Sequence, residues 1–133
     1  MYRVTRSVPF CYGHRLLNYD GKCKHLHGHN ADAVITLESD TLDERGMLVD
    51  FGDIKALVKD WLDRELDHTL LLHRDDPLLP ALREAGERFY LMDDNPTAEN
   101  IARLIFDFVA ASGYPVVEVT LWETGTSSAS YRP

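Results

Sequence analysis

The chain has 133 residues, of which 44% are hydrophobic and 27% charged, and its formal net charge is −8. These values predict one soluble globular domain over residues 1–133. Such an acidic chain lacks the basic surface that non-specific nucleic-acid binding requires, and no apolar run approaches the roughly 18 residues of a membrane span. Residues 1–6 do not lead into the apolar segment of a signal peptide, so we expect a cytoplasmic protein.

Residues 2–14 alternate between apolar and polar positions, which predicts a half-buried strand. His14 has the parity of the apolar positions, so we expect it at the end of this strand on the inner side. Cys11 is interpreted most simply as a small buried hydrophobe. The Asn-Tyr-Asp-Gly sequence at 18–21 then predicts a turn.

A second strand is predicted over residues 27–39, and a dense cluster of histidines lies at its start. Alternate side chains of a strand project to one face, so His25, His27 and His29 would point the same way if this stretch is extended. Antiparallel pairing with the first strand would bring His14 close to His27 and His29. A single histidine is usually an ordinary core or surface residue, but this density predicts a metal site. Three imidazoles with one position left open are typical of catalytic zinc.

Cys23 lies just outside the histidine cluster, where a free thiol is available for chemistry. A disulfide with Cys11 is not expected in a reducing cytoplasm, and a thiolate beside metal ligands is the more useful form. Arg15, Lys22 and Lys24 make this loop locally basic, although a solvated surface loop is by itself the better explanation of those charges.

The first predicted helix begins at Asp50, a plausible N-cap, and carries an apolar stripe at helical spacing until it ends near Leu66. The next segment is less regular. We interpret residues 79–87 as a short helix and residues 88–92 as a short strand.

The second strong helix opens in the Asn95–Asn100 segment, where either Asn95 or Thr97 serves as the N-cap. Its apolar stripe ends before Gly113, which is typical of a helix terminus.

The last strong strand is predicted over Val116–Glu123, and it delivers a carboxylate at the end of an apolar row. A charge in that register is costly unless it binds something. The alternative is a frayed strand end with Glu123 in water. Residues 129–132 are interpreted as a further strand. The resulting β-β-α-α-β-β order predicts an α+β domain with an antiparallel sheet and both helices on one face.

Six motifs, taken in order, resemble those of the 6-pyruvoyl-tetrahydropterin synthase family, and together they cover nearly the whole chain. They are Phe-x-x-x-His, Cys-x-x-x-His-Gly-His, Asp-Phe at a helix start, Leu-Asp-His, Asn-Pro-Thr-x-Glu-Asn and a late Glu-Thr. In this chain they occupy 10–14, 23–29, 50–51, 66–68, 95–100 and 123–124.

The resemblance implies the tunnelling fold, in which the sheets of several subunits join into a barrel and the subunits form a homohexamer. It implies zinc on His14, His27 and His29. Within the family the chain is most similar to the bacterial branch of the queuosine pathway, which converts 7,8-dihydroneopterin triphosphate to 6-carboxy-tetrahydropterin.

The resemblance also implies the remaining roles. Cys23 would transfer a carbon-bound proton, Asp67 and His68 would form a relay beside it, and Glu123 would anchor the pterin ring. The same site is compatible with formation of 6-pyruvoyl-tetrahydropterin. Cys23 weighs against a folate-type branch, in which a glutamate typically serves instead. Cys23, Asp67 and His68 together weigh against a zinc- or pterin-binding module without turnover.

Three features depart from the family pattern. Tyr12-Gly13 stands where two small residues are common, so Tyr12 is expected to reshape the pocket. His25 is an additional imidazole whose role the motif does not define. The segment from 70 to 94 is longer than in the shortest relatives.

Overall fold

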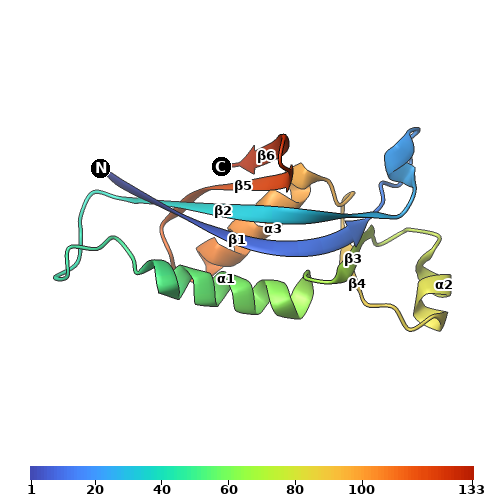
Figure 1. Ribbon diagram of the computed structural model, residues 1–133, viewed down its shortest axis with the longest axis horizontal. Helices are drawn as coiled ribbons and strands as arrows, with labels where there is room; N and C mark the ends of the chain where they lie inside the picture. Colours follow the sequence, from blue (N-terminus) through green and yellow to red (C-terminus); the bar gives the residue numbers. More distant parts are fainter.

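A long β-hairpin forms the centre of the computed structural model, which describes all 133 residues (Figure 1). Strands β1 (Tyr2–His14) and β2 (His27–Ser39) pair antiparallel along their full lengths, and a short 3₁₀ helix, η1 (Lys22–Lys24), lies in their connection. The register sets His14 opposite His27 at the closed end of the hairpin. The predicted pairing of the first two strands is therefore confirmed.

Four further strands complete a six-stranded sheet in the order β4-β3-β1-β2-β5-β6. These are β3 (Thr69–His73), β4 (Phe89–Met92), β5 (Val116–Thr124) and β6 (Ser127–Tyr131). Strand β3 runs parallel to β1 and to β4, whereas the other pairings are antiparallel. The predicted α+β class is confirmed, whereas the predicted antiparallel sheet is wrong, because β3 makes the sheet mixed. The predicted β-β-α-α-β-β order also lacks β3 and β4, which lie between the two predicted long helices. A helical crossover between β3 and β4 makes parallel pairing possible there.

The three α-helices are α1 (Phe51–Glu65), α2 (Leu79–Glu84) and α3 (Ala98–Ala111). The Asp50 side chain caps α1 by accepting a hydrogen bond from the Gly52 N–H. Thr97, rather than Asn95, caps α3 and accepts a hydrogen bond from the Asn100 N–H. Asn95, the other N-cap candidate, instead makes hydrogen bonds to the backbone of Leu17.

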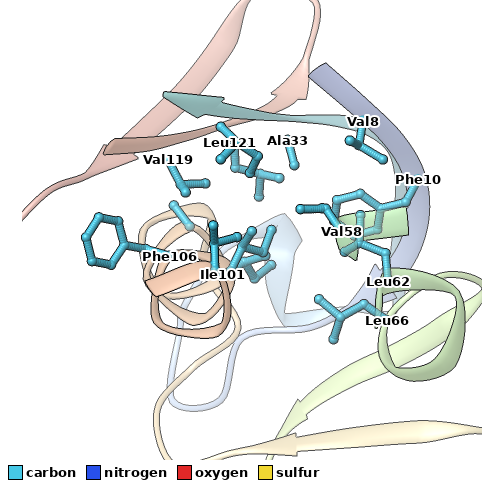
Figure 2. Close-up of a cluster of buried hydrophobic side chains, with 14 of the residues drawn as sticks. Val8, Phe10, Ala33, Val58, Leu62, Leu66, Ile101, Phe106, Val119 and Leu121 are labelled. Carbon is cyan, nitrogen blue, oxygen red and sulfur yellow. The ribbon is translucent and has the colours of Figure 1, made fainter. Parts of the chain in front are cut away.

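Helices α1 and α3 pack side by side on one face of the sheet, as predicted (Figure 1). The parallel rings of Trp61 and Phe108, 4.6 Å apart, join the two helices. The core between helices and sheet is a cluster of 22 buried residues, part of which is drawn in Figure 2. No helix is long and apolar enough to cross a membrane.

The closed end of the hairpin, where β1 ends and β2 begins, extends beyond this core toward η1 and α2 (Figure 1). Gly13 allows β3 to approach β1 here, because a Cβ at this position would lie 2.7 Å from Leu70 Cδ2.

Candidate active site

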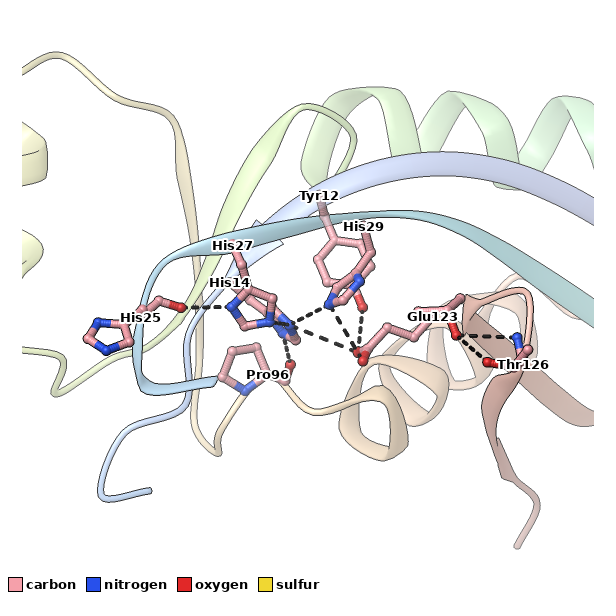
Figure 3. A network of polar contacts seen from close by, with 9 residues as sticks. Tyr12, His14, His25, His27, His29, Pro96, Glu123 and Thr126 are labelled. Carbon is pink, nitrogen blue, oxygen red and sulfur yellow. Dashed lines mark hydrogen bonds and ion pairs between the residues drawn. The ribbon is translucent and has the colours of Figure 1, made fainter. Parts of the chain in front are cut away.

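Three imidazoles meet at the closed end of the hairpin, where β1 supplies His14 and β2 supplies His27 and His29 (Figure 3). The Nε2 atom of His14 lies 2.9 Å from that of His27 and 3.2 Å from that of His29. His14 is only 3% exposed. Strand alternation and the antiparallel register produce this convergence, as expected from the sequence.

The backbone fixes the tautomers of two of these rings. His14 Nδ1 lies 2.7 Å from the Pro96 carbonyl oxygen, and His27 Nδ1 lies 2.7 Å from the His25 carbonyl oxygen. A carbonyl only accepts, so each Nδ1 carries a proton and donates it. In the neutral rings both Nε2 atoms are then unprotonated acceptors.

Two acceptor lone pairs that face each other at 2.9 Å repel unless a cation lies between them. Burial lowers the pKa of His14, although the hydrogen bond to the Pro96 carbonyl acts in the opposite direction. The lowered pKa makes a proton an unfavourable cation between the two Nε2 atoms. A metal ion fits better, since two nitrogen ligands of tetrahedral zinc are separated by about 3.3 Å. The three residues that have donor atoms close enough for this are His14, His27 and His29.

His25 does not join the cluster, although its parity predicted a shared face. It follows η1 outside β2, and its side chain is exposed while its carbonyl accepts from His27. Alternation applies only within a strand, and β2 begins two residues later.

Glu123 points from β5 toward the histidines (Figure 3). Its Oε2 accepts a hydrogen bond of 3.0 Å from the Tyr12 hydroxyl, and its Oε1 lies 3.5 Å from His29 Nε2. The frayed-end interpretation of Glu123 is therefore wrong. Burial and the nearby carboxylate raise the pKa of Tyr12 far above its usual value, so the phenol remains a donor.

Asp67 and His68 lie between α1 and β3, where they bracket the backbone of Cys11. The two Asp67 oxygens accept from the Cys11 N–H at 2.9 Å and from His68 Nδ1 at 2.8 Å. Burial acts to raise the pKa of Asp67, but these hydrogen bonds outweigh it and the pKa is lowered. His68 has a left-handed φ of 54°, which is rare for a residue with a side chain and typical of functional sites.

The thiol that the chain brings to Asp67 and His68 is Cys11 rather than Cys23. The donor atoms of Cys11, Asp67 and His68 all lie within 4.8 Å of one another, and Cys23 is not part of this group. Both cysteines are free and half-buried. Cys11 borders an open cavity of about 530 Å³ that is also lined by His68 and Asn30. The interpretation of Cys11 as a buried hydrophobe is therefore wrong, and its parity, opposite to that of Tyr12, was the available signal.

Asn95 clamps the loop before α3 against the residues that follow His14. Its side chain accepts from the Leu17 N–H at 2.8 Å and donates to the Leu17 carbonyl at 2.9 Å. The Asn100 amide donates to the Asn95 carbonyl at 2.9 Å. These contacts fix the Pro96 carbonyl on which His14 depends. This role was not predicted, and the Asn-Pro-Thr-x-Glu-Asn motif was the only sequence signal that included Asn95.

Arg15 belongs to the basic loop, but an acidic partner neutralises it. Its guanidinium donates to both Asp76 oxygens, at 2.7 and 2.6 Å, and the Asp76 side chain is fully buried. The longer segment after β3 is thus bound to the end of β1, and Arg15 is not free to hold an anion.

Comparisons with known proteins identify the family of the chain. The family model described as 6-pyruvoyl tetrahydropterin synthase matches residues 3–133. A 6-carboxy-5,6,7,8-tetrahydropterin synthase from Rickettsia typhi is 44% identical over 104 residues, covering 77% of this chain and 75% of that protein. The protein of the same name from Aquifex aeolicus is 36% identical over 159 residues, covering 98% of each.

Two solved structures share the fold. An uncharacterized protein from Wolinella succinogenes superposes with a TM-score of 0.85 at 28% identity, covering 98% of this chain and 97% of that one. The 6-pyruvoyl tetrahydropterin synthase of Caenorhabditis elegans superposes with a TM-score of 0.74 at 23% identity, covering 99% and 95%. The expectation of an enzyme, a lyase of this type, is confirmed by the named relatives. By the match over nearly its whole length, the chain belongs to the 6-pyruvoyl tetrahydropterin synthase family.

Proposed function

We propose that the chain converts 7,8-dihydroneopterin triphosphate and one water molecule to 6-carboxy-5,6,7,8-tetrahydropterin, acetaldehyde and triphosphate, as a step toward queuosine. The observation that carries this proposal is the convergence of three imidazole Nε2 atoms beside the Glu123 carboxylate. The names of the Rickettsia typhi and Aquifex aeolicus relatives support the carboxy product over the pyruvoyl one.

His14, His27 and His29 would hold Zn²⁺, because their Nε2 atoms already face one another. Bound zinc would supply a Lewis acid that lowers the pKa of side-chain hydroxyls on the substrate. Glu123 would accept the paired N–H donors of the pterin ring with a carboxylate that is only 24% exposed.

The acid–base groups in this proposal are Cys23, Asp67 and His68. A thiolate at Cys23 would take the carbon-bound proton, since a positioned base accelerates such a step by about 10²–10⁴-fold. Asp67 would orient His68 through the hydrogen bond between them, so that the imidazole is positioned to exchange a proton with the substrate.

We further propose that the chain works as a homohexamer. Strands β4 and β6 are the two edges of the sheet, and edges of this kind are removed when sheets join into a closed barrel. Light scattering that gives a monomer at micromolar concentration would contradict this assembly.

The product distinguishes the two synthase reactions. Cleavage of the side chain leaves one carbon on the ring as a carboxylate and releases acetaldehyde, whereas elimination and tautomerisation keep all three carbons. The zinc-loaded protein should therefore release acetaldehyde, measured with a coupled alcohol dehydrogenase, together with triphosphate. Release of triphosphate alone would move the assignment to the pyruvoyl product. Release of neither acetaldehyde nor triphosphate would indicate a binding module without turnover.

A further inference from the structure

Tyr12 occupies a position where the family pattern has a small residue, and it is packed tightly beside the three histidines (Figure 3). The residue is 3% exposed. Its ring stacks on Phe10 at 5.5 Å and meets the His14 ring edge-on at 5.1 Å. This packing fixes the direction in which the phenol hydroxyl points.

The hydroxyl makes the one hydrogen bond that the Glu123 carboxylate has in the structure, 3.0 Å long at Oε2. The same carboxylate lies 3.5 Å from His29 Nε2 and 3.9 Å from His14 Nε2. Carboxylate oxygens are ordinary zinc ligands. Glu123 is therefore placed to compete with other ligands for a metal ion that these histidines would hold.

We propose that Tyr12 is a positioning residue that holds the Glu123 carboxylate off the metal. The hydrogen bond at Oε2 keeps the carboxylate turned toward β1, which leaves Oε1 free to accept N–H donors of a bound pterin. It also leaves the fourth metal position open for oxygen atoms of the ligand. This inference rests on the proposed function.

Tyr12→Phe tests it, because the variant keeps the buried ring and removes only the hydroxyl. The probes are Co²⁺, whose visible absorption reports coordination, and neopterin, a fluorescent pterin. In Tyr12→Phe the metal should stay bound, and the Co²⁺ spectrum without neopterin should change as the carboxylate joins the ion. Neopterin affinity should fall by about tenfold or more, as for loss of one hydrogen bond to a charged group.

Two further variants make the result specific. Tyr90→Phe is the matched control, because the Tyr90 hydroxyl lies on β4 and makes no hydrogen bond, so both readouts should stay at wild-type values. In a Glu123→Ala background, adding Tyr12→Phe should leave the Co²⁺ spectrum unchanged, since the carboxylate is already absent.

An unchanged spectrum and wild-type neopterin affinity in Tyr12→Phe would overturn the positioning role. A spectral change that persists in the Glu123→Ala background would also overturn it, because Tyr12 would then act on the ligands directly. A wild-type protein that binds neither Co²⁺ nor neopterin would instead refute the proposed function.

Discussion

Asn95→Ala should weaken metal binding although Asn95 touches no metal ligand. The Asn95 side chain clamps its loop to both backbone groups of Leu17, and the adjacent Pro96 carbonyl accepts the proton of His14 Nδ1. Without the clamp, the Pro96 carbonyl is held less firmly, because only the contacts to the Asn95 backbone carbonyl remain. His14 then also loses the preference for the tautomer that presents Nε2 to the metal.

The structure sets the size of this effect. Two neutral hydrogen bonds contribute about 0.5–1.5 kcal/mol each, so the clamp is worth about 1–3 kcal/mol. Loss of an outer partner of a ligating histidine typically lowers metal affinity by about 10–100-fold. A tenfold change corresponds to about 1.4 kcal/mol, so the two ranges agree, and we expect zinc affinity to fall by about 10–100-fold.

Zinc affinity is measured by competition with a chromophoric chelator, and urea unfolding of the metal-free protein is measured alongside it. Glu87→Ala is the control, because the Glu87 side chain is exposed, makes no hydrogen bond and does not line the cavity beside the histidines, so zinc affinity should be unchanged. If Asn95→Ala loses stability while its zinc affinity equals that of the wild type, the clamp serves only folding. The reasoning about His14 would then be refuted.

Three other predictions address the ligands, the thiol and the buried ion pair. His27→Ala should lose stoichiometric zinc in elemental analysis while remaining folded, and full retention of zinc would show the ligand set to be wrong. Cys23→Ala should lower kcat by about 10²–10⁴-fold with zinc retained, and wild-type turnover would exclude the thiol. Asp67→Asn alone should cause a similar loss, and the double variant should lose little more if the groups act as a unit. Burial acts to raise the pKa of Asp76, but Arg15 and a backbone N–H hold it below its usual range. This stabilisation is present above the unfolded value of about 3.9 and is lost as pH falls through the lower folded pKa. Asp76→Asn should therefore be less stable than wild type at pH 7, with a difference that shrinks below about pH 4 in guanidinium unfolding. A constant difference would contradict the assignment.

The convergence of the histidines could be predicted because it depends on local rules. Alternation sets His27 and His29 on the apolar side of β2, and the turn signals at 18–21 imply a hairpin, which aligns His14 with His27. The position of Glu123 on the apolar face of β5 was predicted in the same way, from the alternation of that strand. Each step needed only the period of a strand and one antiparallel pairing.

The position of β3 could not be predicted in this way. Its Thr-Leu-Leu-Leu-His sequence is a short apolar run, which periodicity alone cannot assign to a strand or a helix. Its partners, β1 and β4, are parallel and distant in sequence, so no turn specifies the pairing. The contact between Asp67 and Cys11 depends on this strand, and for that reason it was missed as well.

The separation of Cys23 from Asp67 and His68 gives the proposed assembly a role in the chemistry. Cys11 alternates with Tyr12 along β1 and so faces away from the histidines, and Asp67 and His68 gather around Cys11. We therefore expect a relay that includes Cys23 to take its Asp67–His68 pair from a neighbouring chain of the proposed assembly. Co-refolding inactive Cys23→Ala chains with inactive His68→Ala chains tests this, because random assembly would leave about a quarter of shared sites with both groups intact. We expect activity to return in the mixture and in neither variant alone; a mixture that remains inactive, although it forms the same oligomer, would show that one chain must supply both groups.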